Sequence, residues 1–183
     1  MTASGAMFGY RDRSEEEIRD ISFVKFTNST WSDPQTISND NWNIPGCPVN
    51  GPRMTSLGNT VATAWFTAAE GNAKVKIAFA NSESFSESII IDETSPLGRV
   101  DVILLDKQTA IVSWLDNEGT PAIKYRTIKS DGTMTEPVIV SETSESRGSG
   151  FPQMTIHSKN IYFAWTDYKE ESGSKVLLSK LGL

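Results

Sequence analysis

Apolar and polar residues alternate along most of the chain in short runs, with the two-residue period of half-buried β-strands. Residues 21–26 (ISFVKF) show this alternation clearly, and Gly58-Asn59 is a turn sequence that separates two neighbouring runs. The pattern predicts strands over residues 7–10, 21–26, 35–38, 53–57, 60–66, 73–80, 88–91, 99–105, 109–115, 122–128, 137–140, 151–156, 160–165 and 175–181. Residues 39–52 contain too much proline and glycine for a strand or a helix, so a long irregular loop is expected there.

One short stretch has a helical signature. Ser14 and Glu17 have the spacing of a helix capping box, which makes a helical turn conceivable. The strand pattern returns within a few residues, so a charged loop is the favoured interpretation.

The same strand sequence recurs along the chain. Residues 61–67 (VATAWFT), 111–116 (IVSWLD) and 162–167 (YFAWTD) each place a small residue before a tryptophan, and residues 7–12 (MFGYRD) have tyrosine in its place. The four aromatic residues are 55, 49 and 51 positions apart. Strand-rich repeats with a period of about 50 residues are typical of β-propeller blades. Because Trp65, Trp114 and Trp165 occupy the same place in each repeat, we expect them to pack between blades rather than to bind a sugar.

A second repeat lies in the turns that follow the third strand of each unit. Residues 28–34 (NSTWSDP), 81–87 (NSESFSE) and 130–137 (SDGTMTEP) combine a small hydroxyl residue with a large apolar one and a following Ser or Thr. These turns resemble worn copies of the Asp-box, S-x-D-x-G-x-T-W, and Ser130-Asp131-Gly132 keeps the core of that motif. The chain is similar to the BNR/Asp-box, sialidase-like β-propellers, and this resemblance implies an all-β ring fold and an activity on glycans.

The strand count predicts an incomplete ring. The units cover residues 1–38, 39–92, 93–142 and 143–183, of which the first lacks its innermost strand and the last its outermost. About four incomplete four-stranded blades are fewer than the six of a sialidase-type propeller. Such a chain is either the C-terminal part of a longer ring or a subunit of a homodimer that covers the open sheet edges. A β-sandwich, in which the period would be accidental, is a weaker alternative.

Composition and charge limit the classes of molecule that the chain is expected to bind. The net charge of −6 argues against nucleic acid and anionic membranes, because both select basic surfaces. With one cysteine and one histidine, an internal disulfide is impossible and we expect no metal site and no cofactor. No apolar run is long enough to span a bilayer. The first residues lack the pattern of a signal peptide, which leaves the cellular compartment open.

The resemblance implies that a ligand binds around the axis, on the face where the links between blades emerge. We therefore take the candidate ligand-binding residues from that face. Arginine matches a carboxylate with a bidentate fork, and sialidase-like enzymes hold their acidic sugar with an arginine triad. The alternative is that these arginines cap turn carbonyls or pair with neighbouring acids. The residues are Arg53, Arg99 and Arg147, with Asn50 in the adjacent link and Trp42 in the 39–52 loop as a stacking candidate.

Three acids are weaker catalytic candidates. Asp116 and Asp167 follow the tryptophan strands and could protonate a leaving oxygen, although such residues more often bond to turn amides. Asp101 lies inside a strand next to Arg99, where burial would shift its pKa, or where it forms a structural ion pair. Cys47 and His157 are expected on opposite faces, so a thiol nucleophile with a histidine base is not favoured.

Two functions remain open from the sequence. The leading hypothesis is glycan recognition or glycoside hydrolysis by a complete ring, without activity in this half-ring. The second is a noncatalytic binding or assembly module, because propellers support unrelated activities.

Overall fold

The computed structural model describes residue 2 and residues 5–81, 84–149 and 151–183. Four antiparallel sheets make up the fold, and each is built from strands that are consecutive in the sequence. The first sheet contains β1 (Ala6–Arg11), β2 (Ile21–Thr27), β3 (Thr30–Trp31) and β4 (Gln35–Ser38); the second β5 (Arg53–Leu57), β6 (Thr60–Thr67), β7 (Lys74–Asn81) and β8 (Ile89–Asp92); the third β9 (Pro96–Leu104), β10 (Thr109–Asp116), β11 (Ala122–Lys129) and β12 (Val138–Glu142); the last β13 (Gln153–His157), β14 (Asn160–Lys169) and β15 (Gly173–Gly182). A single short 3-10 turn, η1 (Ala69–Gly71), joins β6 to β7.

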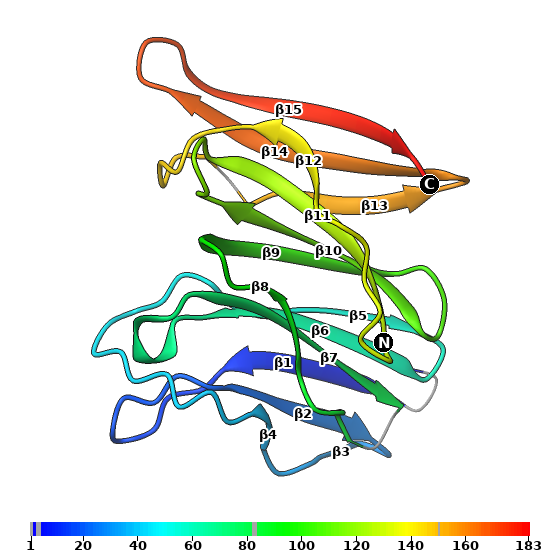
Figure 1. The fold of residues 1–183 in the computed structure, drawn as a ribbon. Coiled ribbons are helices and arrows are strands. Elements are labelled where there is room, and N and C mark those ends of the chain that lie inside the picture. The colour runs from blue at the N-terminus through cyan, green and yellow to red at the C-terminus, as the bar shows by residue number, and fades with distance from the viewer. Residues whose placement is uncertain (1, 3–4, 82–83, 150) are drawn as a thin grey trace.

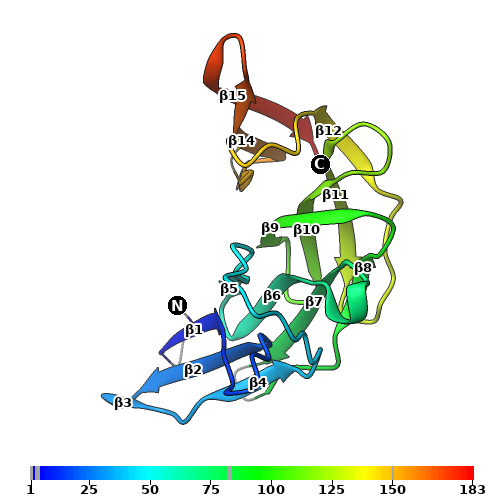
Figure 2. The ribbon, with the colours of Figure 1, turned by 90° about the vertical axis from the view of Figure 1, so that its left-hand side faces the viewer.

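The sheets follow one another along an arc, with the first strand of each sheet on the inner side and the later strands outside (Figures 1 and 2). The inner strands β5 and β9 contact each other, as do β9 and β13. This is a β-propeller arrangement and confirms the all-β propeller prediction. Ser14 caps a tight turn by accepting the amides of Glu16 and Ile18, in a stretch between β1 and β2 that contains no helix.

Most strands match the predicted ranges, and the differences have local causes. β9 begins three residues earlier than predicted because Pro96 and Gly98 pair with the end of β10 through a bulge. β14 runs four residues further because it forms a continuous ladder with β15 from Lys169 to Asn160. In the described residues, no strand lies inside β1 and none lies beyond β15.

The repeated tryptophans are core residues. Trp65 and Trp114 are fully buried and Trp165 is 5% exposed. The Trp65 indole Nε1–H donates to the Asp40 carboxylate over 2.7 Å, and the Trp114 Nε1–H donates to Asp92 over 2.9 Å. Each bond ties a tryptophan to the end of the preceding sheet, and the expectation of packing between blades is confirmed.

The strand that follows the repeated aromatic strand is β2, β7, β11 or β15. On it, two large apolar residues flank the position that pairs with the aromatic residue, and we call them the forward pair. In the first three sheets the forward pair packs against the next sheet: Ile21 and Phe23 cluster with Trp65, Val75 and Ile77 with Trp114, and Ile123 and Tyr125 with Trp165. In the last sheet the forward pair is Val176 and Leu178.

The turns between the third and fourth strands also repeat. Ser32, Ser86 and Thr135 each follow a large apolar residue, and their hydroxyls accept the amides of Lys25, Phe79 and Thr127. Their own amides donate to the carbonyls of the same three residues. The predicted turn repeat is thus a repeated hydrogen-bonded unit, although residues 82–83 of the second copy lie outside the described residues. No helix in the described part of the chain is long and apolar enough to cross a membrane.

Candidate functional site

The links between sheets and the corners between second and third strands emerge together at the left of Figure 1, and we call this side the link face. The 39–52 link, the β12–β13 link and the tip of the β14–β15 hairpin all lie there. The sequence-predicted ligand residues divide between the axis of the arc and the outer part of this face.

Near the axis, Arg53, Asp101 and Gln153 occupy equivalent positions on three inner strands, opposite the residue that precedes each tryptophan. The Asp101 carboxylate accepts the amides of Val102 over 3.0 Å and Met154 over 2.6 Å, and so joins β9 to β13. Burial raises the pKa of Asp101, while these amide bonds and the charge of Arg53 oppose the rise. Both Asp101 oxygens therefore accept backbone amides, one within β9 and the other from the neighbouring sheet.

Asn50 and Arg99 form a clamp between the second and third sheets. The Asn50 side chain accepts the Arg99 amide over 2.9 Å and donates to the Leu97 carbonyl over 3.1 Å. It holds Gly98 and Arg99 in the left-handed region, with φ of 83° and 53°, and a Cβ at Gly98 would lie 2.8 Å from Asn50. The Arg99 guanidinium donates to the carbonyls of Ser149 and Glu145, and burial lowers its pKa.

The remaining predicted acids and Arg147 are scattered. Asp116 is fully buried, 2.6 Å from the Lys124 ammonium, and it also accepts the Glu118 amide. Asp167 accepts the Thr143 hydroxyl over 3.2 Å. Arg147 is exposed on the β12–β13 link. The structure thus does not bring these residues together as an open pair of carboxyl groups of the kind that glycoside hydrolysis requires.

Trp42 lies in the core, packed edge-on against Phe66 at 5.6 Å between ring centroids, with the Arg11 guanidinium 4.8 Å from its ring. Arg11 donates to the carbonyls of Asn50, Arg19 and Phe66, and burial lowers its pKa to about 10. An indole enclosed in this way offers no face for a sugar to stack on. Cys47 is exposed on the 39–52 link and His157 ends β13.

The outer part of the link face contains three neighbouring hollows lined mostly by polar side chains. The first hollow, of about 330 Å³, lies over the first sheet, and it shares Asn39 with a second hollow of about 270 Å³ between the first and second sheets. The second hollow shares Asn72 and Lys74 with a third, of about 560 Å³, between the second and third sheets. Neighbouring hollows share lining residues, so the three lie side by side across three sheets, and we call them together the polar groove.

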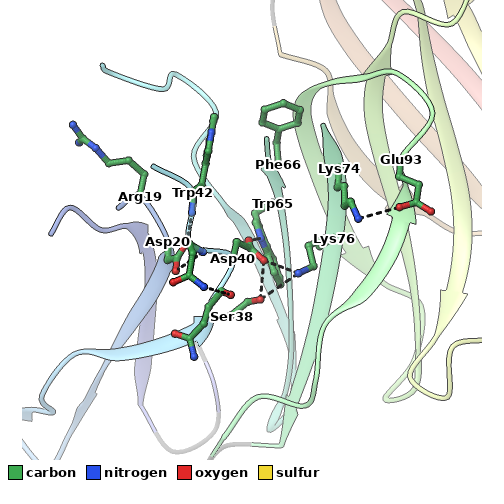
Figure 3. A network of polar contacts seen from close by, with 12 residues as sticks. Arg19, Asp20, Ser38, Asp40, Trp42, Trp65, Phe66, Lys74, Lys76 and Glu93 are labelled. Carbon is green, nitrogen blue, oxygen red and sulfur yellow. Dashed lines mark hydrogen bonds and ion pairs between the residues drawn. The ribbon is translucent and has the colours of Figure 1, made fainter. Parts of the chain in front are cut away.

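The middle hollow is lined by the polar side chains of Asn39, Asp40, Thr67, Glu70, Asn72, Lys74 and Lys76. Figure 3 shows the Lys76 ammonium beside the Asp40 carboxylate at 2.5 Å, with the Trp65 indole on the other carboxylate oxygen. Lys74 reaches across to Glu93 at 3.1 Å. The Thr67 hydroxyl is buried and has no hydrogen-bond partner in the described structure. A buried hydroxyl without a partner is uncommon in proteins, and this one belongs to a residue that lines the polar hollow.

A second carboxylate borders the first hollow. Asp20 accepts the amides of Asn41 over 3.1 Å and Trp42 over 3.3 Å, and so orders the start of the 39–52 link. Burial raises the pKa of Asp20, and the nearby Asp40 charge adds to the rise, while the two amides lower it. No group of three or more His, Cys, Asp or Glu side chains that could hold a metal occurs among the described residues.

Sequence reasoning missed this groove, although a signal for part of it was present. Thr67 stands two residues after Trp65, where the other repeats have Asp12, Asp116 and Asp167. The threonine that replaces aspartate in this repeat is one of the residues that line the middle hollow. Asp40, Glu70 and Asn72 come from separate elements, and no sequence pattern connects them.

The comparisons with known proteins identify the fold. No protein-family model matches the chain, and no curated protein matches its sequence. Among solved structures, it is similar to a xylan β-1,4-xylosidase from Bacillus halodurans (8% identity, 99% of this chain and 38% of that chain, TM-score 0.58). It is also similar to the NanB sialidase from Streptococcus pneumoniae (14% identity, 100% of this chain and 30% of that chain, TM-score 0.60). A third similar structure is the BP39L lectin from Burkholderia pseudomallei (10% identity, 97% of this chain and 51% of that chain, TM-score 0.60). The chain thus spans between about a third and half of these three chains.

Proposed function

We propose that this chain is a glycan-recognising propeller module that binds its ligand in the polar groove of the link face and does not hydrolyse it. The observation that carries the proposal is that three polar hollows lie next to one another across the first, second and third sheets and share lining residues. Ligand sites are usually lined mainly by apolar side chains, so a groove rich in amides, hydroxyls and charges favours a densely hydroxylated ligand. The xylosidase, the sialidase and the lectin named above are consistent with this class of ligand.

The nonhydrolytic role that we propose rests on the hydrogen bonds and ion pairs that already occupy the candidate carboxylates. Asp101 and Asp116, both candidates for acid catalysis, are engaged with amides or a lysine, and Asp116 has no exposure to solvent. Hydrolysis with retention or inversion needs two carboxyl groups about 5–9.5 Å apart on either side of a bound sugar. In the middle hollow the carboxylates are Asp40, which already binds Lys76 and Trp65, and the exposed Glu70. In the flanking hollows Asp20 accepts two amides and Glu93 pairs with Lys74, and Asp12 and Glu16 line the first hollow.

The arginine site at the axis is the second location for a ligand. Arg53 lies near the axis and Arg147 is exposed on the β12–β13 link, and an acidic sugar would bind either of them through charge-assisted hydrogen bonds. Arg99 has fewer N–H groups available for a ligand, because its guanidinium already donates to two carbonyls. The groove is therefore the preferred site.

The test is a titration of the protein with xylohexaose and, separately, with sialyllactose, followed by tryptophan fluorescence. We expect saturable binding of at least one probe and no release of reducing ends from xylohexaose. Asn72→Ala should weaken that binding by about tenfold, the effect of about one good hydrogen bond. Asn72 is exposed, so the melting temperature should not change.

Asn59→Ala is the matched control, because Asn59 is an exposed asparagine in the β5–β6 turn, away from the groove. If neither probe binds, or if Asn72→Ala binds as well as Asn59→Ala, the groove is not the site. Release of sugar at a rate above the blank would contradict the nonhydrolytic assignment.

A further inference from the structure

The last sheet has an apolar face that the other sheets bury. Its forward pair, Val176 and Leu178, is 72% and 77% exposed. The corresponding residues of the second sheet, Val75 and Ile77, are fully buried, and those of the first sheet, Ile21 and Phe23, are at most 2% exposed. The same register position is therefore core in the first two sheets and surface in the last, on which no other sheet of the described residues packs.

The first sheet has the complementary free face. In each internal contact the forward pair packs against the repeated aromatic of the next sheet, as Val75 and Ile77 do against Trp114. In the first sheet Tyr10 occupies that place, and Phe8, two residues earlier, is 54% exposed. Trp31 stacks beside Phe8 at 5.4 Å between centroids and is itself 53% exposed, which extends an aromatic surface on this face.

From these two faces we propose that the chain forms a homodimer in which the forward pair of each copy packs on the Phe8–Tyr10 face of the other. The contact repeats, between molecules, the aliphatic-on-aromatic contact that joins successive sheets within one chain. Both complementary faces are present on the same polypeptide, at the two ends of the arc in Figure 2. A second copy is therefore the partner that fits.

The arrangement closes on itself. Two copies joined by two such contacts are related by a twofold axis, and no free face remains. The ring then contains eight sheets, which lies within the four to eight blades usual for propellers. The contact also covers the apolar surface of β15, which in a monomer would be a site for aggregation.

The test uses two charged variants of exposed residues and their mixture, with the molar mass measured by light scattering at several concentrations. The wild type should have the mass of two chains at micromolar concentration. Leu178→Lys and Phe8→Asp should each raise the dimer dissociation constant by about 30-fold or more, as for the loss of an interface hot spot. Both residues are largely exposed in the single chain, so each variant should remain folded.

Mixing the two variants should restore the mass of two chains. In that pair, one contact places the introduced lysine opposite the introduced aspartate, and the other contact is the unchanged one between Leu178 and Phe8. Val49→Lys is the matched control, because Val49 is an exposed aliphatic residue on the 39–52 link, and this variant should dimerise like the wild type.

A wild type with the mass of one chain at all concentrations would overturn the proposal. So would dimers that Phe8→Asp leaves intact, because they would use two last sheets rather than a last sheet and a first sheet. Failure of the mixture to restore the dimer would also overturn the proposal. The outcome is independent of glycan binding, since neither variant lies in the polar groove.

Discussion

Ile77 and Leu178 occupy the same place in the second and last sheets, opposite the alanine that precedes a tryptophan. Ile77 is fully buried against the third sheet, whereas Leu178 is 77% exposed. The local sequence is equally apolar at both sites, so the repeat pattern alone fixes the strand and its orientation but not its burial. Burial depends on whether another sheet follows.

The largest expected effect lies at the centre of the buried contact. Trp114→Ala should lower the free energy of unfolding by about 3–5 kcal/mol, because it leaves a large cavity between the second and third sheets. Chemical denaturation followed by circular dichroism measures this change. A loss below about 1 kcal/mol would mean that the contact between these sheets does not depend on the indole.

The comparison of Ile77 with Leu178 can be made directly. Ile77→Ala should cost about 2–5 kcal/mol, while Leu178→Ala should cost less than about 0.5 kcal/mol at a concentration at which the protein is monomeric. Equal costs in the dilute protein would show that Leu178 is buried within the single chain.

A smaller difference is expected between two tryptophans. Trp114 donates its Nε1–H to Asp92, but the buried Trp165 Nε1 has no partner in the described structure. Trp114→Phe should therefore cost about 1–3 kcal/mol more than Trp165→Phe, because the first variant leaves a carboxylate without its donor. The two unfolding free energies are measured under identical conditions, and a larger cost for Trp165→Phe would contradict the assignment.

The smallest expected effect is a pH dependence at the contact between the third and last sheets. Burial raises the pKa of Asp101 in the folded protein. Its contribution to stability is therefore complete below its unfolded pKa and is lost as the pH rises through the raised folded pKa. Asp101→Asn removes this dependence, so the wild type should lose stability relative to the variant as the pH rises through that window. A difference that stays constant with pH would mean that the carboxyl group has the same pKa in both states.

The sequence was sufficient to predict the sheets but not the candidate site. The strand periods, the buried tryptophans and the hydroxyl turns are local and repeated, and the structure contains all three. Arg99 binds backbone carbonyls, which was the alternative that the sequence left open for it. Its acceptors, on Ser149 and Glu145, lie about 50 residues away and leave no side-chain pattern that would have identified them. Trp42 was expected at a binding surface because it lies outside the repeat, but its neighbours Arg11 and Phe66 enclose it.

The groove was missed for the same reason. The walls of its middle hollow come from the residues after β4, the end of β6, the η1 corner and β7, which meet only after two sheets have packed together. Only the replacement of aspartate by Thr67 in the repeat marked the place in the sequence.

The pairing of each strand with its neighbours in the sequence has a consequence for how the chain folds. Each sheet is closed by short loops, so its ordering requires little loss of chain entropy and can begin in any of the four sheets. The second and third sheets, each four-stranded and joined by the apolar cluster around Trp114, are where we expect the first stable structure. The outer sheets would then be added one at a time, as in repeat proteins. Both have a single packed face, and the last sheet, which has three strands where the first has four, would be the first to open under native conditions.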